Sequence, residues 1–134
     1  MVVKTLVLVG VVAAMLAHPA ATAPPRVLVS FQQTGGFVAI ERTVTVHTSG
    51  KVVSDGAAVS ALSRARLAAL RDALADARWR TLRAHYAPDV TVSDGFLYAI
   101  TYAGRTIRID QGAPIPARLA RPFLILERLA GLRR

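Results

Sequence analysis

The 134-residue chain contains no cysteine, and other residues on which catalysis depends are scarce. Without cysteine the chain forms neither a disulfide nor a lipoprotein anchor, so core packing and strand pairing must stabilise the fold. The three histidines are His18, His47 and His85, and none stands at metal-ligand spacing from another. We therefore expect neither a metal nor a cofactor.

Acidic residues are also few, eight against 17 lysines and arginines. Asp89 and Asp94 are the one pair close together in a predicted loop, and they are a weak candidate for a glycosidase-type dyad. The sequence has no Gly-x-Ser-x-Gly motif and no glycine-rich phosphate loop before a helix. These absences favour a binding protein over an enzyme.

The N-terminal residues have the pattern of a targeting segment. Lys4 precedes a nearly unbroken apolar stretch at 5–17, and Ala21-Thr22-Ala23 offers the small residues that signal peptidase recognises. The stretch is shorter than the about 20 residues that cross a bilayer. We interpret 1–23 as a signal peptide, which predicts a secreted or cell-envelope protein without a stable membrane span after cleavage. A retained amphiphilic anchor is the alternative.

The net charge of +9 leaves several classes of partner open. A basic surface can bind nucleic acid, an anionic polymer or an acidic protein. However, most of the basic residues are arginines spread along an alanine-rich chain, which is typical of a GC-rich genome and favours a solvated surface. An exported protein also meets little nucleic acid, so we expect no nucleic-acid partner.

The pattern of apolar and turn residues over 26–134 predicts a single α+β domain. Apolar and polar residues alternate over 27–32 and 37–48 on either side of a glycine turn, which indicates a hairpin, and 51–56 predicts a third strand that ends in an Asp-Gly turn. A second hairpin is expected over 95–110, with its turn at Ala103-Gly104.

Two amphipathic helices complete the predicted domain. Leucines at helical spacing indicate a helix over 64–77 with Ser60 as a candidate N-cap, and Trp79 and Leu82 extend its apolar face. A final helix contains Pro122, either as a kink or in its first turn. The order of elements predicts an antiparallel sheet of four or five strands with both helices on one face. The other face is then open to solvent.

The glycine pair Gly35-Gly36 is the most informative local feature. Two adjacent glycines permit positive φ and close approach of another chain, because neither has a Cβ. The simplest interpretation is a hairpin turn, with Phe37 part of the core.

The motifs Thr34-Gly35-Gly36-Phe37 and Asp94-Gly95-Phe96-Leu97-Tyr98 resemble those of the emfourin family, small bacterial inhibitors of thermolysin-like metallopeptidases such as protealysin. The resemblance extends over roughly residues 27 to 130 and includes the leucine-rich helix and the final helix with Pro122. It implies an inhibitor of a thermolysin-like zinc metallopeptidase that acts by inserting loops into the active-site cleft. The implied contact residues are Thr34, Gly35, Gly36, Phe37, Asp94 and Gly95.

The same resemblance suggests roles for individual residues. Thermolysin-like enzymes favour a bulky apolar side chain just after the cut, so Gly36-Phe37 would mimic a substrate bond. Asp94 would approach the zinc or an active-site arginine, although an Asp-Gly turn explains it equally well. We expect a monomer. The alternative function is a secreted or envelope-associated basic binding module for an anionic polymer or an acidic protein.

Overall fold

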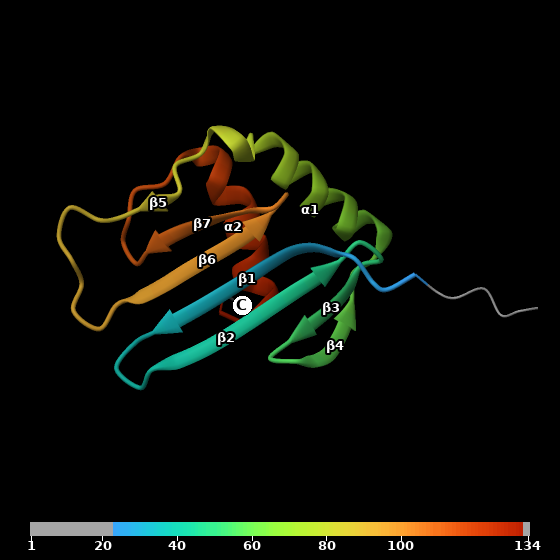
Figure 1. Cartoon of the computed structure of the whole chain (residues 1–134), viewed down its shortest axis with the longest axis horizontal. Helices are drawn as coiled ribbons and strands as arrows, with labels where there is room; N and C mark the ends of the chain where they lie inside the picture. The colour runs from blue at the N-terminus through green and yellow to red at the C-terminus, as the bar shows by residue number, and fades with distance from the viewer. Residues whose placement is uncertain (1–22, 133–134) are drawn as a thin grey trace, which may run out of the picture.

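The computed structural model describes residues 23–132, so nearly all of the predicted signal peptide lies outside the described residues. These residues form one sheet with the strand order β4-β3-β2-β1-β6-β7-β5 (Figure 1). The strands are β1 (Val27–Gly35), β2 (Ile40–His47), β3 (Lys51–Ser54), β4 (Ala57–Ala61), β5 (His85–Tyr86), β6 (Phe96–Tyr102) and β7 (Arg105–Asp110). The helices are α1 (Arg64–Asp76), the 3-10 helix η1 (Trp79–Thr81) and α2 (Ala117–Leu129).

The predicted α+β class is confirmed, whereas the predicted number of four or five strands is wrong, because residues 23–132 contain seven. The two unexpected strands lie at opposite edges of the sheet. All five residues of β4 are exposed, so its sequence has no alternation of buried and exposed positions. β5 has two residues and pairs in parallel with β7, whereas the other strand pairs are antiparallel.

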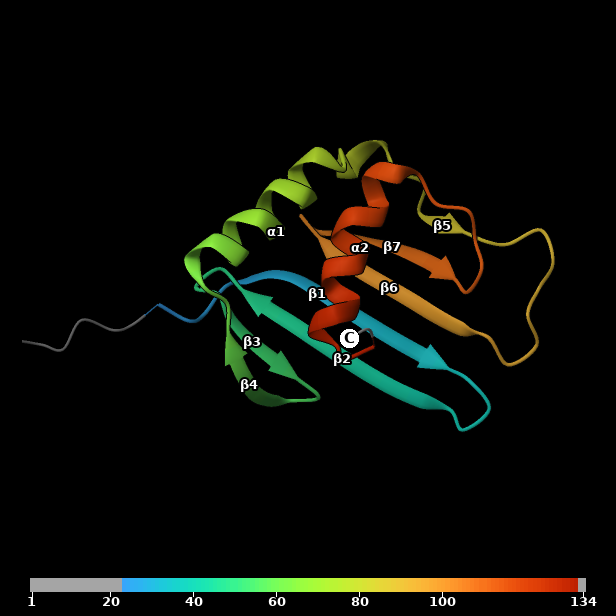
Figure 2. The same ribbon diagram turned by 180° about the vertical axis from the view of Figure 1, so that it is seen from behind.

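Both long helices cover one face of the sheet, as the opposite views of Figures 1 and 2 show. On that face, alternate residues of the central strands are buried and form the core with Leu70 and Leu74 of α1 and Leu119 and Leu126 of α2. Phe31 of β1 is fully buried, and its ring centroid lies 6.0 Å from that of Tyr98 and 6.1 Å from that of Phe123. The core therefore joins the middle of the sheet to α2.

The ends of the helices follow from local sequence. Ser63, rather than the predicted Ser60, caps α1, and its Oγ accepts a hydrogen bond from the Arg66 N–H at 3.2 Å. Ser60 lies in β4 instead. Pro122 is buried inside α2, beyond the first turn. Among residues 23–132, neither helix is long and apolar enough to cross a bilayer.

Candidate functional site

The first predicted site segment is the turn between β1 and β2, residues 36–39, which we call the hairpin tip. The Ala39 N–H donates to the Gly36 carbonyl at 3.0 Å, and Ala39 has a φ of 50°. Phe37 is 93% exposed and Val38 is 77% exposed. The interpretation of Phe37 as a core residue is therefore wrong, since its side chain projects from the turn.

The second predicted segment, Asp94-Gly95, lies directly beside the hairpin tip. β1 pairs with β6 so that Gly35 lies opposite Phe96, and the Gly36 N–H donates to the Gly95 carbonyl at 3.4 Å. A Cβ on Gly35 would lie 2.5 Å from the Gly95 carbonyl oxygen, and a Cβ on Gly36 would lie 2.7 Å from the Phe96 ring. Gly35 is thus required for the close approach to the Gly95 carbonyl, and both glycines suit their φ angles of 103° and 78°.

Asp94 belongs to the loop of residues 87–95, which connects β5 to β6. Asp94 is exposed and has a φ of 57°, a conformation that Asp tolerates better than most residues. The end of this loop is anchored, because the Phe96 N–H donates to Gln111 Oε1 at 2.9 Å and the Gln111 N–H donates to the Phe96 carbonyl at 2.8 Å. The loop and the hairpin tip lie at the same end of the sheet in both views (Figures 1 and 2).

Exposed apolar side chains gather at this end of the molecule. Of the eight large hydrophobic residues exposed in the described chain, six belong to the hairpin tip, the 87–95 loop or the adjoining ends of β2 and β6. These six, which we call the apolar end, are Phe37, Val38, Ile40, Val90, Val92 and Leu97. Scattered apolar residues on a surface are ordinary, but a gathering on two adjacent loops is typical of an interaction site.

The charge at the apolar end differs in sign from that of the whole chain. Neither 27–41 nor 84–104 contains a lysine or an arginine, although the chain has 17 of them. The same segments carry the exposed carboxylates of Glu41, Asp89 and Asp94. This distribution favours a partner whose binding surface is electropositive.

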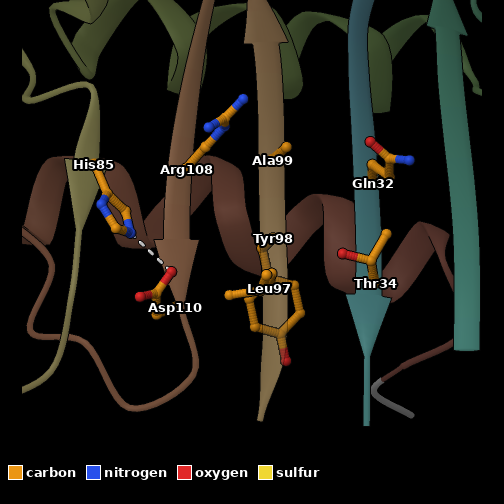
Figure 3. A pocket seen from close by; sticks show the side chains of 8 residues that line it. All are labelled: Gln32, Thr34, His85, Leu97, Tyr98, Ala99, Arg108 and Asp110. Atoms are coloured by element: carbon orange, nitrogen blue, oxygen red, sulfur yellow. Dashed lines mark hydrogen bonds and ion pairs between the residues drawn. The ribbon is translucent and has the colours of Figure 1, made fainter. Parts of the chain in front are cut away.

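A depression of about 470 Å³ lies on the open face of the sheet, next to the apolar end. It is lined by Gln32, Thr34, His85, Leu97, Tyr98, Ala99, Arg108 and Asp110 (Figure 3). His85 Nε2 lies 2.8 Å from Asp110 Oδ1, and Figure 3 shows the Arg108 side chain pointing away from this pair. Leu97 and Asp110 also line a smaller depression of about 60 Å³ beside the 87–95 loop, so the two hollows adjoin.

The His85–Asp110 pair has the geometry in which a carboxylate orients an imidazole. The residues that line the depression include no serine, cysteine or lysine, and the hydroxyl groups among them belong to Thr34 and Tyr98. Sequence reasoning missed this pair because the two residues are 25 positions apart and meet only through the short parallel strand β5. No signal in the sequence marks that strand.

The structure thus brings all six sequence-predicted contact residues to one end of the sheet. Thr34 and Gly35 end β1, Gly36 and Phe37 begin the hairpin tip, and Asp94 and Gly95 end the adjacent loop. Within residues 23–132, no three histidine, aspartate or glutamate side chains gather as a metal site would require. Comparison with protein-family models, curated proteins and solved structures finds no match to this chain.

Proposed function

We propose that this protein inhibits a thermolysin-like zinc metallopeptidase by inserting the hairpin tip into the active-site cleft of the enzyme. The observation that carries the proposal is the exposure of Phe37 and Val38 at the tip of a turn whose glycines pack against β6. Burial of each such side chain in a partner contributes about 1.5 to 3 kcal/mol. A tip that is already held in place loses little conformational freedom on binding.

The backbone of the tip is also available to a partner. The N–H and C=O groups of Phe37 and Val38 have no hydrogen-bond partner among the described residues. When a partner binds a peptide segment, main-chain hydrogen bonds contribute affinity and pockets for the side chains give specificity. Phe37 would supply the bulky apolar side chain, while Gly36, whose missing Cβ faces the Phe96 ring, would hold the tip against β6.

The acidic character of the apolar end fits the same partner. A zinc ion and a neighbouring arginine make a peptidase cleft electropositive, and the exposed Asp94 directly precedes Gly95, whose carbonyl accepts from the tip that would enter the cleft. Asp89 and Glu41 would then contact the rim of the cleft, where charge acts mainly on the rate of association.

The test is the inhibition constant against a panel of thermolysin-like zinc peptidases, measured with a short peptide substrate. We expect the Phe37→Ala/Val38→Ala double variant to inhibit about 30-fold or more weakly, which corresponds to about 2 kcal/mol. The matched control is Val59→Ala, because Val59 is 56% exposed but lies on β4 at the edge of the sheet. The inhibition constant of Val59→Ala should stay within about twofold of that of the unchanged protein.

Two results would count against the proposal. If the unchanged protein inhibits no peptidase of the panel, the proposed inhibitor function is refuted. Equal inhibition by the double variant and by the unchanged protein would keep an inhibitor but move its contact surface away from the hairpin tip.

A further inference from the structure

A cluster of arginines lies apart from the apolar end, in the segment that follows α1. Arg78, Arg80 and Arg83 are exposed and fall within six residues. The backbone that carries them is held by a less exposed arginine: Arg105 Nη1 donates to the Trp79 carbonyl at 2.7 Å, and Nη2 donates to the Leu82 carbonyl at 2.6 Å. The three exposed guanidinium groups therefore extend from a rigid support.

Two arginines of α2 lie at the same corner of the molecule. Arg121 Nη1 lies 3.6 Å from Asp76 Oδ2, which joins the beginning of α2 to the end of α1. Both views show the end of α1, η1 and the N-terminal end of α2 side by side (Figures 1 and 2). We call the set Arg78, Arg80, Arg83, Arg118 and Arg121 the arginine corner; all five are exposed.

The charge of the arginine corner is largely uncompensated. The exposed carboxylates on its elements are Asp72 and Asp76 of α1, and of these Asp76 pairs with Arg121. Within the described residues, the side chains of Arg78, Arg80, Arg83 and Arg118 have no ion-pair or hydrogen-bond partner. Like charges carried on adjoining elements repel one another, and an anionic ligand would reduce that repulsion.

The chemistry of the corner favours phosphate over a lipid bilayer or an apolar protein surface. None of the large hydrophobic residues exposed in the described chain belongs to α1, η1 or α2, so the corner offers nothing to insert into a membrane. Guanidinium groups bind phosphate oxygens in a bidentate manner.

We propose that the arginine corner binds a linear polymer that carries phosphate groups. This site is independent of the inhibitor function, because it lies on the helical layer while the hairpin tip lies at the end of β1 and β2. One group of arginines thus lies on adjoining elements, and four of its five members have no acidic partner among the described residues.

The experiment measures the affinity of the full chain for inorganic polyphosphate between about 50 and 200 mM salt. The test variant is Arg78→Gln/Arg80→Gln/Arg83→Gln. The matched control, Arg26→Gln/Arg64→Gln/Arg66→Gln, removes the same charge from exposed arginines outside the corner. We expect the corner variant to bind at least tenfold more weakly at about 100 mM salt, with a log–log salt slope shallower by about 2.

The control variant should stay within about threefold of the unchanged protein, the difference that long-range charge alone produces at this salt. Equal losses in the two triple variants would overturn the proposal in favour of diffuse charge. Absence of polyphosphate binding by the unchanged protein at low salt would overturn it outright, and so would tighter binding to anionic phospholipid vesicles than to polyphosphate. All of these measurements report binding to phosphate-bearing ligands. Their outcome is therefore separate from that of the peptidase assay.

Discussion

Gly35→Ala is the substitution that tests most directly whether the end of β1, next to the hairpin tip, is held against residues 95 and 96. The new methyl group would lie 2.5 Å from the Gly95 carbonyl oxygen, a distance at which one of the two chains must move. The residue would also have to keep a φ of 103°, which is unfavourable for alanine. The substitution therefore tests a steric contact and a backbone conformation together.

The two contributions can be estimated separately. A positive φ costs an L-residue about 1 to 2 kcal/mol, and forced displacement of well-packed neighbours costs about 1 to 3 kcal/mol. We therefore expect Gly35→Ala to lower the free energy of unfolding by about 2 to 5 kcal/mol. Gly56→Ala is the control, since Gly56 has a φ of 81° but nothing within 4 Å of an added Cβ. Gly56→Ala should lower the free energy of unfolding only through the cost of a positive φ, by about 1 to 2 kcal/mol.

Urea unfolding monitored by circular dichroism measures the difference in the free energy of unfolding between the two variants. The free energy of unfolding typically falls by about 1 to 3 kcal/mol per molar urea, so the unfolding midpoints of the two variants should differ by about 1 M urea. Equal loss of stability in Gly35→Ala and Gly56→Ala would refute the close contact between the tip and the beginning of β6. The inhibitor proposal would then lose its claim to a preorganised tip.

Three further substitutions test the contacts that hold the sheet, the apolar end and the arginine corner in place, and each is measured by urea unfolding. Phe31→Ala should cost about 3 to 5 kcal/mol because it leaves a cavity among fully buried neighbours, and a loss under about 1 kcal/mol would contradict the described core. Arg105→Gln should cost about 2 to 4 kcal/mol and make the 78–83 segment accessible to trypsin, because two carbonyls lose charged donors; unchanged trypsin resistance would contradict that role. Asp110→Asn should cost less than about 1 kcal/mol, since the His85 side chain is 53% exposed and solvent screens the pair, so a larger loss would show that the pair is structural.

The elements with strong periodicity were predictable from the sequence, and the weak edge strands were not. Both hairpins, the helix that begins at Arg64 and the burial of Trp79 and Leu82 follow from apolar spacing and turn residues. β4 reads Ala-Ala-Val-Ser-Ala and buries no side chain, so its pairing with β3 depends on backbone hydrogen bonds that no side-chain pattern records.

Sequence motifs named the segments of the candidate site, but their geometry was not predictable. The glycine pair indicated a turn, and the same motif could equally have placed Phe37 in the core. Its exposure follows from the register of β1 and β2, which ends at Gly35 and Ile40 and leaves four residues in the turn. The arginine corner depends on the approach of α2 to the end of α1, a contact between residues far apart in the chain.

The central position of β1 determines how long an exposed turn survives among peptidases. Hydrolysis of the Gly36–Phe37 bond requires flanking residues to become extended and leave their strands, yet β1 is hydrogen-bonded to β2 on one side and to β6 on the other. Such an opening separates the middle of the sheet, so it approaches global unfolding. Cleavage at the turn then follows the unfolded population, and each 1.4 kcal/mol lost anywhere in the core speeds it about tenfold. The chemical lifetime of the turn is thus set by residues such as Phe31, which is fully buried in the core.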